Sequence, residues 1–393
     1  MSRAAKIILK KDEERRVLAG HPWVYSNEIE GKLREFAPGD AVDVHAHGGT
    51  FLGRGYVNPR SLIAVRIVTT GREELHAPLF RRKFEAARAY RDRVMPGAAL
   101  RREIFADSDG LPGLIVDRFG GTLAVQSGTA GMDIRQKSVV SALEEVYRPD
   151  AVVFANRGSG RELEGLAESV EVVRGSVPDI LWVEEAGLAF PVDILTGQKT
   201  GFFLDQQENR RRLAGFARNE TVLDVFSYTG ALALHALKGG ASSAALLDAS
   251  GRALRLAGEA LDRNGFSGRY ELMEGDAFPL LRSLVKEGRR FGVVSTDPPA
   301  LAKSKKHLPE ALRAYQELAV NGLKLTAPGG FYAASSCSFH VDAGAFRETL
   351  ARAVRRSGRT ARIAEWRGAA PDHPVHPAIP ETAYLKCVIL AVE

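Results

Sequence analysis

Cysteine is scarce in this sequence: the 393 residues include two, Cys337 and Cys387. Two cysteines cannot build a disulfide framework or supply the four ligands of a structural zinc site, so each must be interpreted alone. Long apolar runs are missing as well, since none approaches the roughly 20 residues that span a bilayer. Residues 1–16 are charged and lack the apolar stretch of a signal peptide. We therefore expect a cytoplasmic protein that binds neither a membrane nor a metal ion.

The composition is that of an ordinary globular protein, with 45% hydrophobic and 26% charged residues. At about 100 to 200 residues per domain, the length predicts two or three domains. The net charge of +6 divides into +4 over residues 1–72, −2 over residues 73–180 and +4 over residues 181–393. This modest excess suits a polyanionic partner but does not require one.

The first 180 residues have the pattern of two small domains. Residues 1–72 are short alternating stretches separated by Gly, Pro and Asn, which is typical of a small β-barrel. Residues 73–180 contain a predicted helix over 78–94, two strands around Gly120-Gly121, a helix over 133–146 and the strand AVVFAN. We interpret this second range as a small α+β domain.

From residue 181 to 393, predicted strands alternate with helices of about ten residues or more. The pattern predicts βαβ units around a parallel sheet, and the segments ARIAEW and AYLKCVILAV close it with two further strands. The proposed domains are therefore residues 1–72, 73–180 and 181–393.

Acidic residues recur at the carboxyl ends of the first predicted strands, where open α/β sheets bind their ligands. Asp224 is followed by the turn Ser227-Tyr228-Thr229-Gly230, which lacks the GxGxxG spacing of a dinucleotide site. Asp248 comes about 20 residues after that turn, where a carboxylate can accept hydrogen bonds from ribose hydroxyls. Asp276 follows the third strand. A single strand-end aspartate is commonly a helix N-cap, but three in succession favour a ligand site.

The fourth and fifth predicted strands lead to the residues that are the best candidates for catalysis. Asp297 precedes two prolines, which stiffen the loop and hold the carboxylate in a fixed direction, although a rigid turn alone is the simpler interpretation. Cys337 lies among serines at a strand end, where hydroxyls and amides can stabilise a thiolate. Cys387 lies within the apolar strand LKCVILAV and is interpreted as a small buried hydrophobic residue.

The segments DVFSYTG, LLDAS, GDAF, TDPP and SSCS, in this order, resemble the motifs of class I S-adenosylmethionine-dependent methyltransferases. More narrowly, GHPWVYSNEI, TGQKTGFFLDQQENRR and DHPVHPAIPETAYLK resemble the bacterial large-subunit (23S) ribosomal RNA 5-methylcytosine methyltransferases. The resemblance covers nearly the whole chain. It implies an N-terminal PUA-like β-barrel, a small central α+β domain and a C-terminal Rossmann-like methyltransferase domain.

The resemblance also implies roles for individual residues around S-adenosylmethionine. The implied cofactor-binding residues are Asp224, Phe226, Ser227, Tyr228 and Gly230 at the methionine end, Asp248 and Ala249 at the ribose, Asp276 and Ala277 at the adenine, Gln198, Lys199, Thr200 and Phe202 in a covering loop, and Arg210 at the carboxylate.

The same resemblance implies catalysis by Cys337 and Asp297. Carbon 5 of cytosine is a poor nucleophile, so a Cys337 thiolate adds to carbon 6 while Asp297 holds ring nitrogen 3 protonated. Methylation of an exocyclic amine needs no thiol and usually shows Asn-Pro-Pro. The target base has to be unstacked, and the N-terminal barrel is the expected RNA-holding module, with a purely structural barrel as the alternative.

Other functions stay open at this point. A ribosome assembly factor with the same fold, either non-catalytic or amine-methylating, can bind RNA without forming 5-methylcytosine. A small-molecule methyltransferase is less compatible with the two extra N-terminal domains. The partner expected from the resemblance is ribosomal RNA, in the large subunit or an assembly intermediate, and a homodimer is left open.

Overall fold

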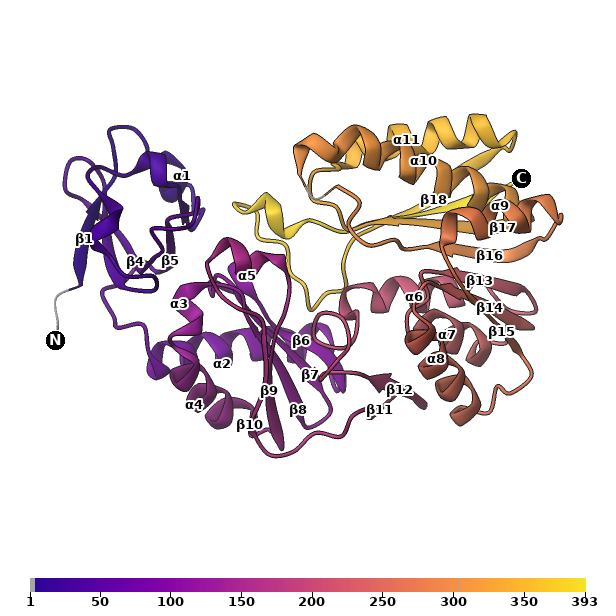
Figure 1. Ribbon diagram of the computed structural model, residues 1–393, viewed down its shortest axis with the longest axis horizontal. Coiled ribbons are helices and arrows are strands. Elements are labelled where there is room, and N and C mark those ends of the chain that lie inside the picture. Colours follow the sequence, from indigo (N-terminus) through magenta and orange to yellow (C-terminus); the bar gives the residue numbers. More distant parts are fainter. Residues whose placement is uncertain (1–3, 303) are drawn as a thin grey trace. The chain divides into compact units, whose positions relative to one another are not determined.

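The computed structural model describes residues 4–302 and 304–393, and these fold into two compact units (Figure 1). The first unit contains the chain up to Val183 together with Val192–Leu204 and Pro371–Thr382. The second contains Glu184–Pro191, Asp205–Ala370 and Ala383–Glu393. No helix in the described ranges is long and apolar enough to cross a membrane.

A sheet of five short strands opens the first unit, as the alternating pattern predicts. The strand order is β1-β3-β4-β5-β2, and β1 is parallel to β3 while the other pairs are antiparallel. Val24, Val44 and Val57 are fully buried in its core. The elements are β1 (Ala5–Ile8), α1 (Arg15–Leu18), β2 (Trp23–Val24), β3 (Ala41–His45), β4 (Phe51–Val57) and β5 (Val65–Thr69).

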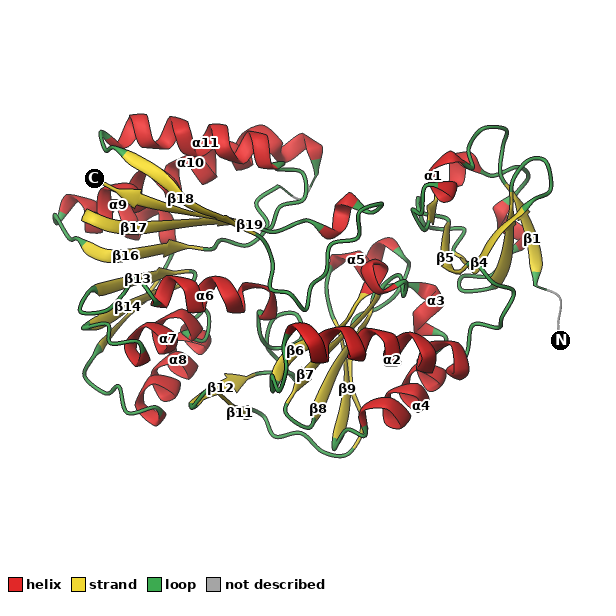
Figure 2. Cartoon of the chain, turned by 180° about the vertical axis from the view of Figure 1, so that it is seen from behind, coloured by secondary structure: helices red, strands yellow, loops and turns green. Residues whose placement is uncertain are grey.

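The rest of the first unit is a second sheet covered by helices, and it agrees with the predicted α+β pattern. The strand order is β10-β9-β8-β7-β6, and α2 packs beside α4 over the apolar core (Figure 2). Strands β6 and β10 were not predicted. The elements are α2 (Ala77–Val94), β6 (Leu100–Phe105), β7 (Leu114–Phe119), β8 (Thr122–Ser127), α3 (Ala130–Asp133), α4 (Gln136–Tyr147), β9 (Ala151–Asn156), α5 (Ser159–Leu163) and β10 (Ser169–Arg174).

Tyr56 of β4 joins these two sheets into one unit. Its side chain is 1% exposed and belongs to the core of the second sheet. The phenol donates a hydrogen bond to the carbonyl oxygen of Pro112 at 2.6 Å and lies 2.9 Å from the hydroxyl of Thr129. A Cβ atom on Gly131 would come within 2.0 Å of the Tyr56 ring, so glycine is required for this close approach. The first two predicted domains therefore share one compact unit, and the boundary between them at residue 72 stays a prediction.

A buried carboxylate also fixes the TGQKTG segment to the first unit. Asp117 of β7 has no exposed surface, and its two oxygens accept hydrogen bonds from Arg102 at 2.7 and 2.9 Å. The hydroxyl of Thr200 donates to the same carboxylate at 2.5 Å. The backbone N–H of Arg102 in turn donates to Asp372 at 2.7 Å. Segments that are far apart in the sequence thus depend on one buried ionic cluster.

The second unit is built on a seven-stranded sheet of order β15-β14-β13-β16-β17-β19-β18, as the βαβ rhythm predicts. All neighbouring strands are parallel except those that pair with β19. The elements are β13 (Thr221–Val225), α7 (Ala231–Lys238), β14 (Ser243–Asp248), α8 (Gly251–Arg263), β15 (Tyr270–Glu274), α9 (Ala277–Lys286), β16 (Phe291–Thr296), α10 (Leu308–Leu325), β17 (Thr326–Ser336), α11 (Ala343–Ser357), β18 (Ala361–Arg367) and β19 (Lys386–Val392), preceded by the hairpin β11 (Leu181–Glu185) and β12 (Leu188–Val192) and by α6 (Gln207–Ala214).

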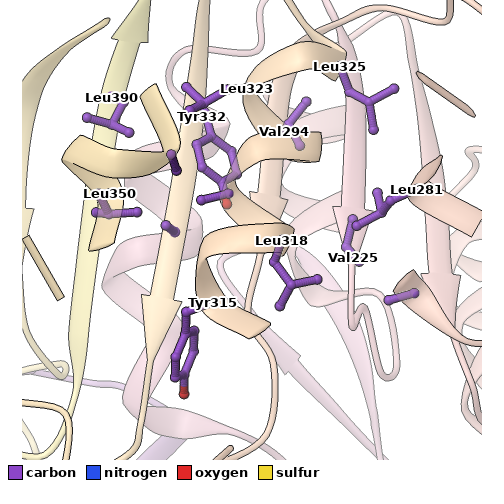
Figure 3. Close-up of a cluster of buried hydrophobic side chains, with 14 of the residues drawn as sticks. Val225, Leu281, Val294, Tyr315, Leu318, Leu323, Leu325, Tyr332, Leu350 and Leu390 are labelled. Atoms are coloured by element: carbon purple, nitrogen blue, oxygen red, sulfur yellow. The ribbon is translucent and has the colours of Figure 1, made fainter. Parts of the chain in front are cut away.

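Helices cover this sheet on both faces. Helices α9, α10 and α11 contribute to one apolar core with the sheet, which includes Leu318, Leu350, Leu390 and Tyr332 (Figure 3). The buried Tyr332 phenol lies 2.7 Å from the hydroxyl of Thr296, so its polar atom is satisfied. Helices α6, α7 and α8 pack together on the other face. Strand order reverses between β13 and β16, and such a reversal leaves a crevice at the carboxyl ends of the strands.

The cluster around Asp117 predicts a large loss of stability in one variant. Asp117→Ala leaves the buried Arg102 guanidinium without its bidentate carboxylate, so we expect the free energy of unfolding in urea to fall by about 3 to 5 kcal/mol. Glu348→Ala, which removes an exposed partner of Arg352 on α11, should change it by less than about 0.5 kcal/mol. Equal free energies of unfolding for the two variants would show that the cluster around Asp117 contributes little to stability.

Candidate active site

The turn after β13 has an unusual backbone conformation. Phe226 and Tyr228 have φ angles of +64° and +49°, in the left-handed region that non-glycine residues rarely adopt. Gly230, at φ +76°, leaves room for Leu246, whose Cδ2 atom would lie 2.9 Å from an added Cβ. Backbone strain of this kind persists where the surrounding structure enforces it and is common at ligand sites. The turn is one part of the predicted cofactor site.

Asp248 at the end of β14 holds this turn in place. Its Oδ2 atom accepts a hydrogen bond from the backbone N–H of Tyr228, and Oδ1 accepts one from the backbone N–H of Ser250, both at 2.9 Å. Each carboxylate oxygen has a further lone pair, so the side chain can still accept hydrogen bonds from a ligand. Ala249, which follows it, is exposed.

Asp276 has the N-cap role that was the simpler interpretation of a strand-end aspartate. Its Oδ1 atom accepts a hydrogen bond from the backbone N–H of Phe278 at 2.9 Å, in the first turn of α9. The side chain is exposed, and Ala277 is buried. The cap uses one carboxylate oxygen, so a role toward adenine stays a prediction.

A small cavity of about 20 Å³ lies at the reversal of strand order. This volume is close to the minimum that holds one water molecule. The walls come from α6, from the ends of β13, β16 and β17, and from β19. The lining residues are Gln206, Asn209, Arg210, Leu213, Asp224, Phe226, Ser227, Leu232, Ser295, Asp297, Ser335 and Cys387.

Buried charges dominate this cavity. Burial raises the pKa of Asp224 to about 7, Arg210 acts against that rise, and Asp297 adds to it. Burial also lowers the pKa of Arg210, while Asp297, Asp205 and Asp224 act to raise it. One guanidinium thus faces several carboxylates, and a cationic ligand group would favour the ionised form of Asp224. The ammonium and sulfonium groups of S-adenosylmethionine have the matching charge.

Two polar atoms in the wall lack a hydrogen-bond partner among the residues that the structure describes. They are the hydroxyl of Ser227 and the side-chain Nε2 atom of Gln206, and both are buried. A buried polar atom without a partner is costly, so such atoms commonly mark a place for a ligand or a water molecule. The Gln206 amide nitrogen needs an acceptor such as a carboxylate oxygen, whereas the Ser227 hydroxyl can donate or accept, so these two atoms fit a polar ligand.

Cys337 and Asp297 lie on neighbouring loops after β17 and β16. The Cys337 thiol donates to the carbonyl oxygen of Pro298 at 3.9 Å, which brings it to the Asp-Pro-Pro turn. The hydroxyl of Ser338 accepts a hydrogen bond from the backbone N–H of Ala302 at 3.1 Å, and this contact ties the two loops together. The two predicted catalytic residues thus belong to one connected part of the fold.

Cys387 has a more polar environment than its apolar strand suggests. It is 1% exposed, as expected for a buried residue, but it pairs with Ser335 across the β17–β19 ladder and lines the cavity. Burial raises the pKa of its thiol to about 12, so it is neutral at physiological pH. No pattern in the sequence indicated this position, because it depends on the register of two strands.

The predicted covering loop belongs to the first unit. Gln198 and Lys199 are exposed, whereas Thr200 and Phe202 are buried, and Lys199 has a φ of +51°. The Lys199 ammonium lies 4.5 Å from the centre of the Phe203 ring. The contacts described for Thr200 are with the first unit itself, so the cofactor-binding role of this loop stays a prediction.

Several lining residues were not predicted. Ser295 and Ser335 lie near the carboxyl ends of β16 and β17, where the strand-end rule could have found them. Gln206 lies four residues before Arg210, and Asn209 lies directly before it. Because residues four apart share one face of a helix, a helical projection could have placed Gln206 beside Arg210.

Comparisons with known families agree with this architecture. A sequence model described as a PUA-like domain matches residues 7–70, and one described as an S-adenosylmethionine-dependent methyltransferase matches residues 165–384. Among solved structures, one described as a candidate SAM-dependent methyltransferase from Streptococcus mutans superposes with a TM-score of 0.83 at 19% identity. The alignment covers 98% of this chain and 100% of that chain. This likeness extends to the fold of nearly the whole chain.

Two relatives, both called ribosomal RNA large subunit methyltransferase I, match along the whole length. The protein from Pseudoalteromonas atlantica is 35% identical over 393 residues, covering 99% of this chain and 100% of the relative. The protein from Shewanella frigidimarina is 37% identical over 399 residues, with the same coverage. The chain therefore belongs to the S-adenosylmethionine-dependent methyltransferases, in the family of the large subunit methyltransferase I proteins.

Proposed function

We propose that this methyltransferase forms 5-methylcytosine in large-subunit (23S) ribosomal RNA and that Cys337 is the nucleophile. The observation that carries the proposal is the contact between the Cys337 thiol and the Pro298 carbonyl, which brings a cysteine to the Asp-Pro-Pro turn. The names of the full-length relatives support ribosomal RNA as the substrate. Such a substrate also favours a cytoplasmic location.

In the proposed mechanism, the Cys337 thiolate forms a bond to carbon 6 of the cytosine. Asp297 keeps ring nitrogen 3 protonated, so the electron pair of the carbon 5–carbon 6 double bond makes carbon 5 nucleophilic. S-adenosylmethionine, when bound, supplies the electrophilic methyl group that carbon 5 takes up. Loss of the carbon 5 proton then restores the double bond and breaks the bond between carbon 6 and sulfur.

The residues that would hold S-adenosylmethionine come from the edge described above. Asp224, Ser227 and Arg210 form the charged cavity, and Asp248 lies after the neighbouring strand. Ser227 has a buried hydroxyl that needs a partner, and Asp224 has a carboxyl that a cation would ionise. These features favour the methionine end at the cavity and the ribose at Asp248.

The RNA must present an unstacked cytosine, because a base within a duplex hides its carbon 6 from a thiolate. The PUA-like match and the +4 charge of residues 1–72 support the N-terminal sheet as an RNA-holding surface. Exposed lysines in this part of the chain include Lys6 and Lys11.

Asp248→Ala is expected to weaken S-adenosylmethionine binding about ten- to a hundredfold. The variant loses a charged acceptor for the ribose hydroxyls and the two backbone hydrogen bonds that hold the turn. Isothermal calorimetry measures the affinity, and circular dichroism verifies the fold. Glu259→Ala on the exposed side of α8 is the matched control and should bind normally. Unchanged affinity in a folded Asp248→Ala protein would remove Asp248 from the site.

Cys337→Ala should fold, bind cofactor and yield no 5-methylcytosine, because the variant has no thiol at this loop to form the bond to carbon 6. With RNA that contains 5-fluorocytosine there is no carbon 5 proton to remove, so the wild-type enzyme should stall as a covalent complex. Mass spectrometry should locate the adduct on Cys337.

The product distinguishes this function from its alternatives. In 23S RNA from a strain that lacks the gene, bisulfite should convert one cytosine that is resistant in the parent strain. Adding back the wild-type gene should restore the resistance, whereas adding back the Cys337→Ala gene should not. Activity in Cys337→Ala, or an adduct on Cys387, would contradict the mechanism and favour methylation of an amine. Absence of any methylation in the wild type would favour a non-catalytic assembly factor.

RNA binding should weaken steeply with salt, since phosphate contacts release counterions. Because Tyr56 belongs to a shared core, we test the N-terminal sheet by charge substitutions and not by truncation. Lys6→Gln with Lys11→Gln should reduce the slope of log affinity against log salt by about 0.7 for each phosphate that the variant no longer neutralises. Lys137→Gln on α4, also exposed, is the control. Identical slopes in all three proteins would assign this sheet a structural role.

A further inference from the structure

Lys386 is a buried cation that is held by backbone carbonyl groups. The residue, at the start of β19, is 6% exposed, although lysine is rarely buried without an anionic partner. Its ammonium donates hydrogen bonds to the carbonyl oxygens of Ser338 at 2.8 Å and Tyr384 at 2.7 Å. No carboxylate of the described residues forms an ion pair with it. Burying a charge in this way is costly, so the position calls for an explanation beyond packing.

The ammonium belongs to the immediate surroundings of Cys337. Ser338, whose carbonyl it binds, follows Cys337 directly, and Lys386 lies opposite Ser336 in the β17–β19 ladder. Two carbonyl oxygens orient the ammonium and leave its third N–H for another acceptor. Burial lowers the pKa of Lys386 to about 8, while Cys337 and Asp342 act in the opposite direction. At pH 7 the side chain is therefore mostly protonated.

Several titratable groups lie on the elements around Cys337, and His340 follows it on the same loop. A nearby carboxylate disfavours a thiolate; Asp297 lies on the neighbouring loop after β16, and Asp342 is the N-cap residue of α11. Tyr315 of α10 donates or accepts at the Ser338 hydroxyl at 2.9 Å, and burial raises the pKa of its phenol, which stays neutral. A cation close to Cys337 favours its thiolate over its neutral thiol.

We propose that Lys386 is a positioning residue that stabilises Cys337 as a thiolate. The inference rests on the proposed function, in which Cys337 is the nucleophile. The thiol proton passes to solvent, the ammonium keeps its own proton throughout, and no bond to Lys386 forms or breaks. The two carbonyl contacts hold the charge in place before substrate arrives, so little reorganisation is needed when the thiolate forms.

The test is the pH dependence of Cys337 alkylation in the full-length enzyme without substrate. Iodoacetamide reacts with the thiolate, and peptide mass spectrometry follows Cys337 separately from the buried Cys387. The wild type should titrate below the value of about 8.5 that is typical of free cysteine. A midpoint at or above that value would overturn the proposal even if no variant folds.

Lys386→Gln keeps amide donors for the two carbonyls but removes the charge. We expect its alkylation midpoint to rise by at least about one pH unit, which corresponds to about tenfold slower alkylation at pH 7. Lys386→Arg keeps the charge and should restore much of the wild-type profile. Lys286→Met, on the exposed side of α9, is the control and should match the wild type. A wild-type profile in Lys386→Gln, or an equal defect in Lys386→Arg, would overturn the proposal.

Methylation assays separate this inference from the proposed function. If Cys337→Ala still forms 5-methylcytosine, the proposed nucleophile is wrong whatever the alkylation profiles are. If Cys337→Ala is inactive while Lys386→Gln alkylates as the wild type does, the nucleophile stands and the role of Lys386 is wrong.

Discussion

The reversal of strand order between β13 and β16 is the constraint on which the second unit depends. At this point the helices leave toward opposite faces of the sheet, so neither helix layer covers the carboxyl ends of the two strands. Asp224 and Asp297 meet there because each lies at the end of one of these strands. The cavity is small because α6 and the β17–β19 pair close it from the sides. The same topology that completes the hydrophobic core therefore gathers charged groups at one edge.

Two cations, Arg210 and Lys386, have different surroundings at this edge. Arg210 faces the carboxylates of Asp224 and Asp297, so its charge is locally compensated. Lys386 is held by backbone carbonyls, and Cys337 and Asp342 both act to raise its pKa against the effect of burial. Because Lys386 pairs with Ser336 while Cys387 pairs with Ser335, Lys386 and Cys387 point to opposite faces of the sheet. Cys387 lines the cavity with a neutral thiol, whereas the Lys386 ammonium donates to the carbonyl oxygen of Ser338, the residue after Cys337.

The sequence could predict features that depend on local pattern. Helix α7 over Ala231–Lys238 follows from apolar periodicity, and Asp248 follows from the rule for strand ends. Features that depend on long-range pairing could not be predicted. The polar surroundings of Cys387 and the contact of Lys386 with Ser338 require the register of β19 against β17. Strand β10 was missed although Val170 and Val172 alternate with polar residues, and these two valines remain partly exposed in the structure. The sequence pattern predicts Tyr56 as an ordinary strand residue of the first sheet, yet its side chain belongs to the core of the second sheet.

Thr200 illustrates how a motif can serve the fold. The resemblance to known methyltransferases associates it with the cofactor, but its hydroxyl proton is donated to Asp117, a fully buried carboxylate of the first unit. A hydroxyl donates one proton and has two lone pairs, so this bond leaves its acceptor capacity intact. Its neighbour Lys199 has a left-handed backbone, a conformation that persists only where the surrounding structure enforces it. The bond from Thr200 to Asp117 is one such constraint. A motif residue with a buried hydrogen bond thus fixes the shape of its loop, whatever ligand the exposed residues beside it contact.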